Sequence, residues 1–384
     1  MTNAAPLKVL WLIKGLGPGG AEQLLVNQAR ATDPLAATIH VAYLVPWKDH
    51  HVATLESLGA TVHALDAPRE LDPRWILRLR SLLGRERFDV VHTHSPVVAA
   101  AVRLAARTLR PRPALVYTEH NRWPRHARST RLANRLTFGL DDAQLAVSDD
   151  VRSTIPSGHR RRVETLIHGT DLDAVRGAIT SRSAVRKELG LADDRVVVGI
   201  VANFRREKAY EVFLDAAAKA ILRNPSLDFV SVGQGPLEDE MRQRLADMTR
   251  DEPAIAGRIQ LLGYRDDAIR VMSGFDVFTL TSDHEGLPVS LMDALALGLP
   301  TVATAVGGIP QAIANDTHGL LVPARNSSAL ADAYVRIAED ADLRARFAGA
   351  ASQRAPTFDI TTATRRLEAI YADVSSTPAG KSRR

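Results

Sequence analysis

Short runs of aliphatic and β-branched residues alternate with longer segments of helical periodicity along the whole chain. The runs lie at 8–13, 38–44, 61–65, 90–92, 114–118, 143–147 and 163–167, and then at 196–201, 227–232, 259–262, 277–280 and 301–303. Amphipathic segments such as 207–222 and 237–248 fill the gaps between them. This alternation is typical of βαβ units, in which helices join parallel strands. Because 384 residues are about twice the length of a common domain, the pattern predicts two doubly wound α/β domains in tandem.

A cluster of turn-forming residues follows the seventh of these runs. His168, Gly169, Thr170 and Asp171 lie directly after residue 167 and before a polar, helix-prone stretch. Because glycine and aspartate favour turns and helix caps, we place the domain boundary here. Near the end, the segment that begins at Pro356 breaks one helix before a further helical stretch, which could pack on either domain.

The composition excludes several kinds of site and of protein. The chain has no cysteine, so disulfides, thiolate nucleophiles and cysteine-based zinc or iron–sulfur sites are excluded. Hydrophobic residues make up 45% and charged residues 24%, which is typical of a folded globular chain. No apolar run approaches the ~20 residues of a membrane-spanning helix, and the first residues do not resemble a signal peptide. We therefore expect a cytoplasmic protein.

Arginine is concentrated in the first half of the chain. Residues 69–138 carry 15 arginines but only 5 acidic residues. Within this region, residues 73–83 form a basic amphipathic stretch. It could contact anionic headgroups peripherally at the inner face of the membrane, or it could be a surface helix of the first sheet. Nucleic acid is disfavoured as a partner, because no aromatic residues are interleaved with the arginines as they are in a base-stacking surface.

A glycine-rich loop at 15–20 follows the first strand. Ligands of open parallel sheets bind at the carboxyl ends of the strands, so loops in this place are informative. Gly19 and Gly20 end the loop, and a helix begins near Glu22. Glycines let backbone N–H groups approach an anion, and the helix N-terminus adds a partial positive charge. The loop predicts a phosphate site, with a plain tight turn as the alternative. It is not a dinucleotide-binding motif, since the second strand does not end in an acid.

Charged residues also follow two strands of the second half. Arg205 and Lys208 follow one strand, and the segment 282–294 follows another. In that segment Glu285 lies in a loop, Pro288 fits the first position of a helix, and Asp293 lies within the helix. The N–H groups at the start of such a helix can face an anion. The sequence therefore predicts that Arg205, Lys208 and this helix end hold a diphosphate.

Five motifs together resemble the family 4 retaining glycosyltransferases of the GT-B fold. They lie at 19–22, 168–171, 233–236, 285–293 and 306–310, and the resemblance extends over residues 8–374. It implies two Rossmann-like doubly wound domains that face a cleft, with a final helix that crosses back to the first. The acceptor-binding N-terminal domain would comprise residues 1–172 together with helix 358–374. The C-terminal domain, which binds the nucleotide sugar, would comprise residues 173–357.

The resemblance also implies roles for individual residues. Glu285 is the first of the family's two motif acids, which seven residues separate, and would lie near the donor sugar. Lys208 would bind the diphosphate, and His120 would lie near the outer hydroxyls of the sugar. Together with Arg205 these residues form the implied catalytic set. The implied donor-binding set is Gly19, Gly20, Asn203, Tyr264, Gly286, Leu287, Val289 and Asp293. Of these, Gly286 and Leu287 would contact sugar hydroxyls, and Tyr264 lies where the family's backbone contacts the base.

Three positions depart from the family's pattern. Asp293 occupies the place of the second acid, which accepts hydrogen bonds from the ribose; its shorter side chain implies a weaker or water-bridged contact. Asn203 stands where the family has an arginine, and we expect Arg205 to replace that arginine. Gln311 stands where a glutamate commonly follows the Gly-Gly-Ile-Pro motif. These departures motivate the alternative of a non-catalytic protein that binds nucleotide sugars.

Two further polar clusters have plainer interpretations. His92 and His94 follow a strand and could be cleft residues or structural ones. Asp171 and Asp173 match the acid pair with which the other major glycosyltransferase fold holds a metal, but helix capping is the favoured interpretation at this turn. Because no other cluster of histidines and aspartates has the spacing of metal ligands, we predict no metal and no cofactor.

The predicted reaction moves a sugar from a nucleotide diphosphate sugar to a hydroxyl of a glycan, a lipid or a small molecule. The resemblance implies retention of anomeric configuration, independence from metal ions, and front-face attack in which the departing phosphate oxygen takes the acceptor proton. Glu285 as a covalent nucleophile is the competing version. A UDP-sugar is the first choice of donor and GDP-mannose the second. A nucleotide-sugar epimerase or hydrolase of the same fold is the alternative reaction.

Overall fold

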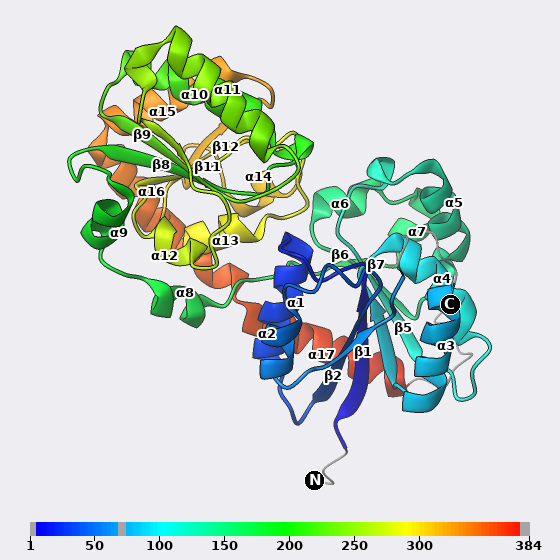
Figure 1. Cartoon of the computed structure of the whole chain (residues 1–384). Helices are drawn as coiled ribbons and strands as arrows, with labels where there is room; N and C mark the ends of the chain where they lie inside the picture. Colours follow the sequence, from blue (N-terminus) through cyan, green and yellow to red (C-terminus); the bar gives the residue numbers. More distant parts are fainter. Residues whose placement is uncertain (1–4, 68–73, 377–384) are drawn as a thin grey trace. The chain divides into compact units, whose positions relative to one another are not determined.

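The computed structural model describes residues 5–67 and 74–376, which form two compact units (Figure 1). Unit 1 comprises the described residues up to Gly169 and those from Asp359 onward, and unit 2 comprises Thr170–Phe358. The sequence placed these boundaries at 172/173 and 357/358. The final helix, α17 (Ile360–Ser376), belongs to unit 1.

Unit 1 is built on a seven-stranded sheet whose strands all run parallel. The strands are β1 (Leu7–Ile13), β2 (Ala37–Tyr43), β3 (Thr61–Ala64), β4 (Val90–Thr93), β5 (Ala114–Glu119), β6 (Ala143–Ala146) and β7 (Val163–Thr165). Their order is β3-β2-β1-β4-β5-β6-β7, so the winding direction reverses between β1 and β4. In doubly wound sheets such a reversal opens a crevice for ligands at the carboxyl ends of the strands.

Helices cover both faces of this sheet (Figure 1). In addition to α17 they are α1 (Gly20–Ala31), α2 (Val52–Ser57), α3 (Arg74–Glu86), α4 (Pro96–Ala106), α5 (Arg128–Thr137), α6 (Asp149–Thr154) and α7 (Ser157–Arg160), with 3-10 turns η1 (Trp123–Arg125) and η2 (Phe138–Leu140). Side chains of β1 alternate between the two core layers. The layer that contains Trp11 also contains Leu367, Ile370 and Tyr371 of α17, so the last helix completes the core of unit 1.

Helix α3 contains most of the basic amphipathic stretch at 73–83, of which residue 73 lies outside the described residues. Its apolar side chains Trp75, Leu79, Leu82 and Leu83 are buried in the second core layer. Full burial of such a side chain stabilises the folded state by roughly 1.5–3 kcal/mol, so this side of α3 packs stably against the sheet. Of the large apolar residues of α3, Leu77 alone is strongly exposed (70%). The stretch is therefore a surface helix of the first sheet, and contact of its exposed side with anionic headgroups stays a prediction.

Unit 2 is built on a six-stranded parallel sheet in the order β10-β9-β8-β11-β12-β13. The strands are β8 (Val196–Val201), β9 (Leu227–Val232), β10 (Ile259–Leu261), β11 (Val277–Leu280), β12 (Thr301–Thr304) and β13 (Gly319–Val322). The helices are α8 (Leu172–Ala178), α9 (Arg182–Leu189), α10 (Tyr210–Arg223), α11 (Glu238–Asp251), α12 (Ala268–Met272), α13 (Val289–Ala296), α14 (Ile309–Ala312), α15 (Ser327–Glu339) and α16 (Ala341–Arg354), with turns η3 (Arg206–Lys208), η4 (Pro253–Ile255) and η5 (Ala355–Phe358).

Two details of unit 2 differ from the sequence prediction, although the predicted doubly wound α/β fold is confirmed in both units. The sequence analysis missed β13, a four-residue strand that begins with Gly319. A Cβ atom on Gly319 would lie 1.8 Å from the carbonyl oxygen of Thr301, so the close approach of β12 requires glycine there. The second difference is at α13, where Pro288 is the N-cap residue and Val289 is the first helical residue.

Candidate functional site

A charged cluster lies where β8 and β11 end. The turn η3, which follows β8, carries Lys208, and the loop between β11 and α13 carries Ser282 and Glu285. Lys208 Nζ and Ser282 Oγ both donate to Glu285 Oε1, each at 2.6 Å. Ser282 is fully buried and Glu285 is 9% exposed. Because both contacts use Oε1, Oε2 is the oxygen with which this carboxylate can accept a hydrogen bond from a ligand.

The loop that carries Glu285 is fixed by its neighbours. The backbone N–H of Asp283 donates to Glu207 O (2.9 Å), which ties the loop to η3. On the other side, the N–H of Gly308 donates to Gly286 O (2.8 Å). Gly307 has φ +57°, and a Cβ atom there would lie 2.0 Å from Glu285 O. The motif at 306–310 therefore holds the loop by a backbone approach that only glycine permits.

The glycines of the motif at 233–236 have a similar task beside β8. Gly233 has φ +155°, and a Cβ atom on it would lie 1.9 Å from Ala202 O; a Cβ atom on Gly235 would lie 2.5 Å from Phe204 O. Phe204 N also donates to Gln234 O (3.0 Å). The two strand-end loops therefore pack backbone against backbone, which positions the residues that follow β8.

Asn203 and Arg205 follow β8, whereas Tyr264 follows β10, which lies two strands away in the sheet of unit 2. Arg205 is exposed, and its backbone N–H donates to Asn203 O (2.8 Å), while its own carbonyl accepts from Lys208 N (3.0 Å). Asn203 is half-buried, and Tyr264, which follows β10, is 40% exposed. The backbone thus links Asn203, Arg205 and Lys208 in one turn. Arg205 is thus an exposed residue in the turn that carries Lys208.

The segment after Glu285 leads into the start of α13. Leu287 and Val289 are each 9% exposed, and Gly286 is half-buried. The first N–H groups of an α-helix have no partner within the helix, and the helix dipole gives them a partial positive charge. The N-terminus of α13 therefore adds anion-binding capacity to the cluster of Lys208 and Glu285.

Asp293 lies in α13, and one oxygen of its carboxylate already accepts a hydrogen bond within the protein. Thr170 Oγ1 donates to Asp293 Oδ1 at 2.5 Å. Burial raises the pKa of Asp293 to about 6, against the opposing effect of the Thr170 hydrogen bond. Oδ2 is the oxygen that can accept from a ligand. The sequence analysis did not foresee the contact with Thr170, which belongs to the predicted boundary turn.

The glycine-rich loop of unit 1 is closely packed. Gly15 lies against the side chain of Lys48, where an added Cβ atom would lie 2.8 Å from Cδ, and Leu16 N donates to Lys48 O (2.7 Å). A Cβ atom on Gly19 would lie 2.2 Å from a carboxylate oxygen of Glu22. Gly19 is the N-cap residue of α1, and Gly20 is its first residue.

His120 lies at the end of β5 in a row of four imidazoles. His94 Nδ1 and His120 Nε2 are 3.2 Å apart, the rings of His92 and His94 have centroids 4.1 Å apart, and the ring of His120 stacks on that of His168 at 5.7 Å. Burial, together with the neighbouring imidazoles, lowers the pKa of His92, His94 and His120 well below 6.5. Burial alone lowers the pKa of His168 to about 4. All four rings are therefore neutral at pH 7.

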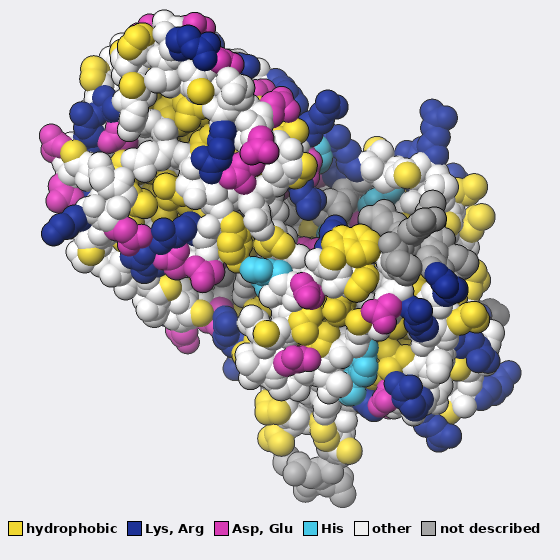
Figure 2. All heavy atoms as spheres, in the orientation of Figure 1, with side chains coloured by type: hydrophobic (Ala, Val, Ile, Leu, Met, Phe, Trp, Pro, Cys, Tyr) yellow, Lys and Arg dark blue, Asp and Glu magenta, His cyan; other side chains and the backbone are white. Residues whose placement is uncertain are grey.

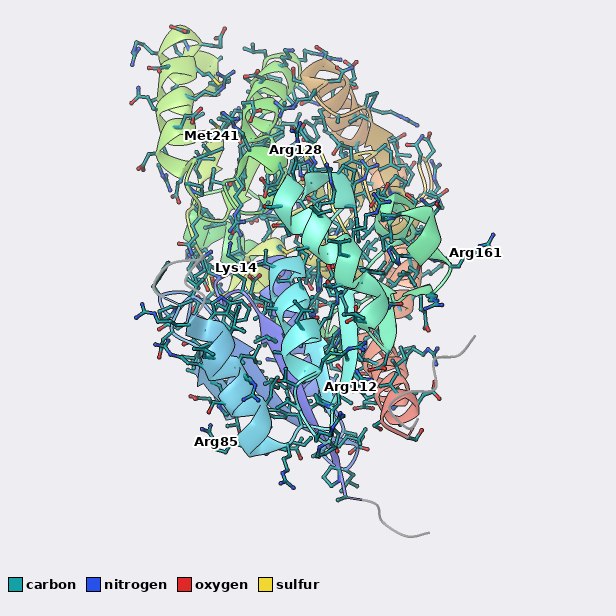
Figure 3. The ribbon with its side chains drawn as sticks, turned by 90° about the vertical axis from the view of Figure 1, so that its right-hand side faces the viewer. Lys14, Arg85, Arg112, Arg128, Arg161 and Met241 are labelled. Carbon is teal, nitrogen blue, oxygen red and sulfur yellow. The ribbon has the colours of Figure 1, made fainter. Side chains whose placement is uncertain are left out.

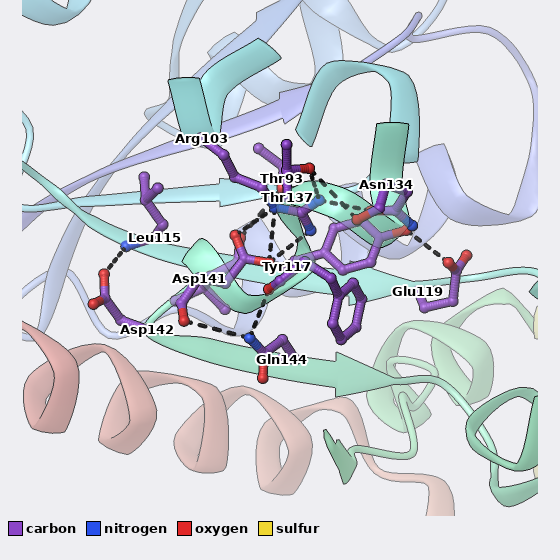
Figure 4. A network of polar contacts seen from close by, with 12 residues as sticks. Thr93, Arg103, Leu115, Tyr117, Glu119, Asn134, Thr137, Asp141, Asp142 and Gln144 are labelled. Carbon is purple, nitrogen blue, oxygen red and sulfur yellow. Dashed lines mark hydrogen bonds and ion pairs between the residues drawn. The ribbon is translucent and has the colours of Figure 1, made fainter. Parts of the chain in front are cut away.

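A buried polar network fixes the loop that follows His120 (Figure 4). Glu119 Oε2 accepts from the hydroxyl of Tyr117 (2.7 Å) and lies 3.1 Å from His126 Nε2. Beneath Tyr117, the fully buried Arg103 forms a bidentate ion pair with Asp141, at 2.6 and 2.9 Å. This network connects β5 to α4 and α5 and holds the strand end that carries His120.

The predicted site residues therefore form two groups. Unit 2 brings together Lys208 and Glu285. Arg205, Asn203, Gly286 and Leu287 lie on the same strand-end loops, and Val289 begins α13. Asp293 is bound to Thr170, and Tyr264 follows β10. Gly19, Gly20 and His120 belong to unit 1. Sequence reasoning missed Ser282 and Thr170, and it left His92 and His94 outside the site. Asp171 caps α8 by accepting from Ala174 N (2.9 Å), which agrees with the capping interpretation.

Within residues 5–67 and 74–376, no group of three or more His, Cys, Asp or Glu side chains could hold a metal ion. Over these ranges, no helix has both the length and the apolar character needed to cross a membrane.

Known proteins of similar sequence and structure identify the family. The model of glycosyltransferase family 4 matches residues 18–174, and the model of the group 1 glycosyl transferases matches residues 195–340. The chain is 25% identical over 320 residues to the UDP-Gal:α-D-GlcNAc-diphosphoundecaprenol α-1,3-galactosyltransferase of Escherichia coli, covering 79% of this chain and 80% of that one. It is 28% identical over 317 residues to the D-inositol 3-phosphate glycosyltransferase of Saccharomonospora viridis, covering 78% and 68% of the two chains.

Solved structures show the same fold. The crystal structure of Anabaena Alr3699/HepE in complex with UDP has a TM-score of 0.81 at 22% identity and covers 96% of this chain and 100% of that one. A glycosyltransferase from Rickettsia africae has a TM-score of 0.83 at 17% identity, with coverage of 97% and 100%. Together with the strand-end cluster, these similarities show that the chain is a glycosyltransferase of the GT-B fold and belongs to family 4.

Proposed function

We propose that this glycosyltransferase moves a sugar from a nucleotide diphosphate sugar to an acceptor hydroxyl with retention of anomeric configuration and without a metal ion. One observation carries the proposal. Lys208, Ser282 and Glu285 meet beside the N-terminus of α13, so a cation, a carboxylate and a helix N-terminus lie together at the carboxyl ends of β8 and β11. Such a set can bind a diphosphate and a sugar hydroxyl side by side.

The chemistry that this set must support is the departure of a diphosphate. The bond from the anomeric carbon to the β-phosphate oxygen breaks, and a bond from the same carbon to the acceptor oxygen forms on the same face. The acceptor proton passes to the departing phosphate oxygen, so the products are a glycoside and a nucleoside diphosphate. Negative charge grows on the phosphate oxygens in the transition state, where Lys208, Arg205 and the N–H groups of α13 stabilise it.

Glu285 has a different task in this proposal. Its Oε1 is held by Lys208 and Ser282, while Oε2 accepts a hydrogen bond from a sugar hydroxyl and so orients the donor sugar. We assign nucleotide-sugar binding to unit 2 and acceptor binding to unit 1. His120 is proposed to bind an outer hydroxyl of the sugar: its Nε2 is engaged by His94, which leaves Nδ1 to form that hydrogen bond.

A UDP-sugar is the proposed donor, with GDP-mannose next. Two similarities favour uridine: the E. coli relative is named for UDP-Gal, and the Anabaena structure contains UDP. The acceptor is the hydroxyl of a glycan, a lipid or a small molecule.

The donor is tested by thermal unfolding of the full chain in the presence of UDP, GDP, TDP or ADP sugars. A ligand present at 100 times its Kd stabilises the native state by about 2.7 kcal/mol, which gives a clear shift in Tm for the correct base. The selected donor is then incubated with candidate acceptors, with and without EDTA. We expect an EDTA-insensitive product whose anomeric configuration, read by NMR, matches that of the donor. Inversion, loss of activity in EDTA, or release of free or epimerised sugar alone would contradict the proposal.

We further propose that unit 1 contacts an anionic membrane peripherally, through α4 and α5. Helix α5 exposes Leu132 and Leu136, at 59% and 75%, and the adjacent α4 exposes Val97 and Leu104, at 44% and 59%. Residues 120–140, which include α5, contain 5 arginines and no acid. Figure 3 looks onto α3, α4 and α5 and shows Arg85 and Arg128 on this side. Exposed leucines between arginines are suited to an anionic lipid surface, to which each nearby arginine adds roughly 1 kcal/mol.

Vesicle co-sedimentation tests this surface. We expect binding to vesicles that contain phosphatidylglycerol and not to vesicles of phosphatidylcholine alone. The double variant Leu132→Gln/Leu136→Gln should lose it. Leu222→Gln, which changes a leucine of α10 that is 51% exposed, is the matched control. Binding that is insensitive to anionic lipid, or equal in both variants, would contradict the proposal.

A further inference from the structure

A buried chain of hydrogen bonds begins at β1 and ends at β5. Trp11 Nε1 lies 3.0 Å from the hydroxyl of Tyr371, and that hydroxyl lies 2.6 Å from His92 Nδ1. His92 Nε2 in turn lies 2.7 Å from Thr118 Oγ1. Each of these four residues is at most 1% exposed. Trp11 and His92 are paired in register on β1 and β4, and α17 brings Tyr371 to them, although it lies 279 residues after His92 in the chain.

The chemistry of the partners sets the direction of each hydrogen bond. An indole N–H can only donate, so the oxygen of Tyr371 accepts from Trp11. Burial raises the pKa of Tyr371, so its hydroxyl keeps its proton. That proton needs an acceptor, since an unsatisfied buried hydroxyl is costly, and His92 Nδ1 is the acceptor within reach. A neutral imidazole that accepts at Nδ1 carries its proton on Nε2, which then donates to Thr118.

His92 is the first ring of the row that includes His120. Its ring lies against that of His94, whose Nδ1 bonds to His120 Nε2. The hydrogen bonds of one tautomer hold the ring of His92 in one orientation; if the ring turned, His94 would lose the surface against which it packs, and His120 would shift with it. A shift of about 1 Å in a group that contacts a substrate can lower a rate by about a hundredfold.

We propose that Tyr371 is a positioning residue for the transferase: its hydroxyl fixes the ring orientation and the tautomer of His92, and through His94 it sets the position of His120. The inference rests on the proposed function of His120. It also gives α17 a task beyond packing, because the last helix supplies a hydrogen bond to a site formed by the strands of unit 1.

The test compares Tyr371→Phe with Tyr334→Phe. Tyr334 is a matched control because it is fully buried, and its hydroxyl contacts Thr279 (2.7 Å) in unit 2, away from the histidines. Long-range ¹⁵N NMR of histidine-labelled protein reports each imidazole tautomer, and the His92 signal is assigned by its loss in His92→Gln. We expect a single Nε2–H tautomer in the wild type and in Tyr334→Phe, and a mixture of tautomers in Tyr371→Phe.

Kinetics provide the second readout. We expect kcat of Tyr371→Phe to fall about ten- to a hundredfold, with the affinity for the nucleoside diphosphate unchanged because unit 2 binds it. Tyr334→Phe should keep its kcat. An unchanged His92 tautomer in Tyr371→Phe, or equal kcat in the two variants, would overturn the inference. So would an Nδ1–H tautomer in the wild type, a result that does not depend on whether the variant folds. If the wild type transferred no sugar, the proposed function would fail, while the NMR result would still decide the role of Tyr371.

Discussion

At the carboxyl ends of their strands, unit 1 presents neutral imidazoles and unit 2 presents paired charges. The two sheets have the same doubly wound architecture, yet His92, His94, His120 and His168 are all held neutral by burial, whereas Lys208 and Glu285 form an ion pair. Beside that pair, Asp283 is paired with Arg325. Acidic and basic side chains are also intermingled over the visible surface of unit 2 (Figure 2).

This difference shows what each unit is suited to bind. A neutral imidazole offers one donor and one acceptor, which matches a hydroxyl group. A lysine, an exposed arginine and a helix N-terminus match a diphosphate. We therefore propose that the same fold binds hydroxyls in one unit and anions in the other, through residues that lie just after the strands.

The largest expected effect comes from removing the carboxylate of unit 2. Glu285→Ala should lower kcat by about two to three orders of magnitude, because the donor sugar loses the group that orients it. Glu188→Ala is the matched control, since it removes an ion-paired carboxylate of unit 2 outside the strand-end cluster, where it contacts Arg265 and Arg270. Steady-state kinetics and circular dichroism measure activity and folding. Equal kcat in the two variants would show that the charged cluster is structural.

The second effect is a difference between the two units in how their folding stability changes as the pH falls. A histidine that titrates at 6.5 when unfolded but at about 4 when folded binds more protons in the unfolded state between these values, so stability falls as the pH drops through this window. For His168 alone the loss between pH 7.5 and pH 5 is about 2 kcal/mol. His40 and His51 of unit 1 also have pKa values lowered to about 4 by burial.

Asp293 in unit 2 acts in the opposite direction. Its folded pKa of about 6 lies above the usual 3.8, so its contribution to stability is present at low pH and is lost as the pH rises through 6. In unit 1, burial also raises the pKa of Asp141 to about 6, but the three histidines whose pKa values are lowered to about 4 outweigh this one carboxyl. Hydrogen exchange measured by mass spectrometry at pH 7.5 and pH 5, corrected for the intrinsic rates, should therefore show a larger loss of protection in unit 1 than in unit 2. A larger loss in unit 2 would contradict the neutral state of the imidazoles.

A smaller effect tests Asp293 as the acceptor of ribose hydroxyls. The affinity of the wild type for the nucleoside, which lacks phosphates that titrate, should fall about tenfold as Asp293 gains its proton between pH 7.5 and pH 5. Asp293→Asn should bind weakly at both pH values. Calorimetric titration at the two pH values measures these affinities. If the affinity of the wild type did not change with pH, Asp293 would not be the acceptor of ribose hydroxyls.

The smallest effect concerns the choice of arginine. Arg205→Ala should weaken binding of the nucleoside diphosphate about three- to tenfold, in keeping with an exposed charge, and Arg206→Ala should change it little. Both side chains are exposed and adjacent in the chain, so each is the control for the other. A larger loss in Arg206→Ala would show that Arg205 does not replace the arginine missing at Asn203.

The sequence was sufficient for the fold because alternation of strand and helix patterns is a local signal. It failed at Gly319–Val322, which is short, begins with glycine and is defined as a strand by its pairing with β12. The close backbone contacts that require glycine at positions 233 and 307 could not be predicted from the sequence either. Only the folded backbone shows which carbonyl groups lie where a Cβ atom would be.

The candidate site was predictable where a motif lies on one loop, and less so where distant residues meet. Glu285 and Lys208 are 77 residues apart and come together because β8 and β11 are neighbours in the sheet. The hydrogen bonds of Thr170 to Asp293 and of Tyr371 to His92 cannot be predicted from the sequence, because a single hydroxyl-bearing residue forms no repeating pattern. Hydrogen-bond partners of this kind are found only in the structure.

The most direct test of the central claim, that Lys208 binds the diphosphate in unit 2, is calorimetric binding of a nucleoside diphosphate and of its nucleoside to the wild type and to Lys208→Ala. We use UDP and uridine, or the pair that the thermal screen selects. We expect the substitution to weaken UDP binding at least tenfold, about 1.4 kcal/mol, and to leave uridine binding unchanged. Equal losses for UDP and uridine, or no loss for UDP, would contradict the claim.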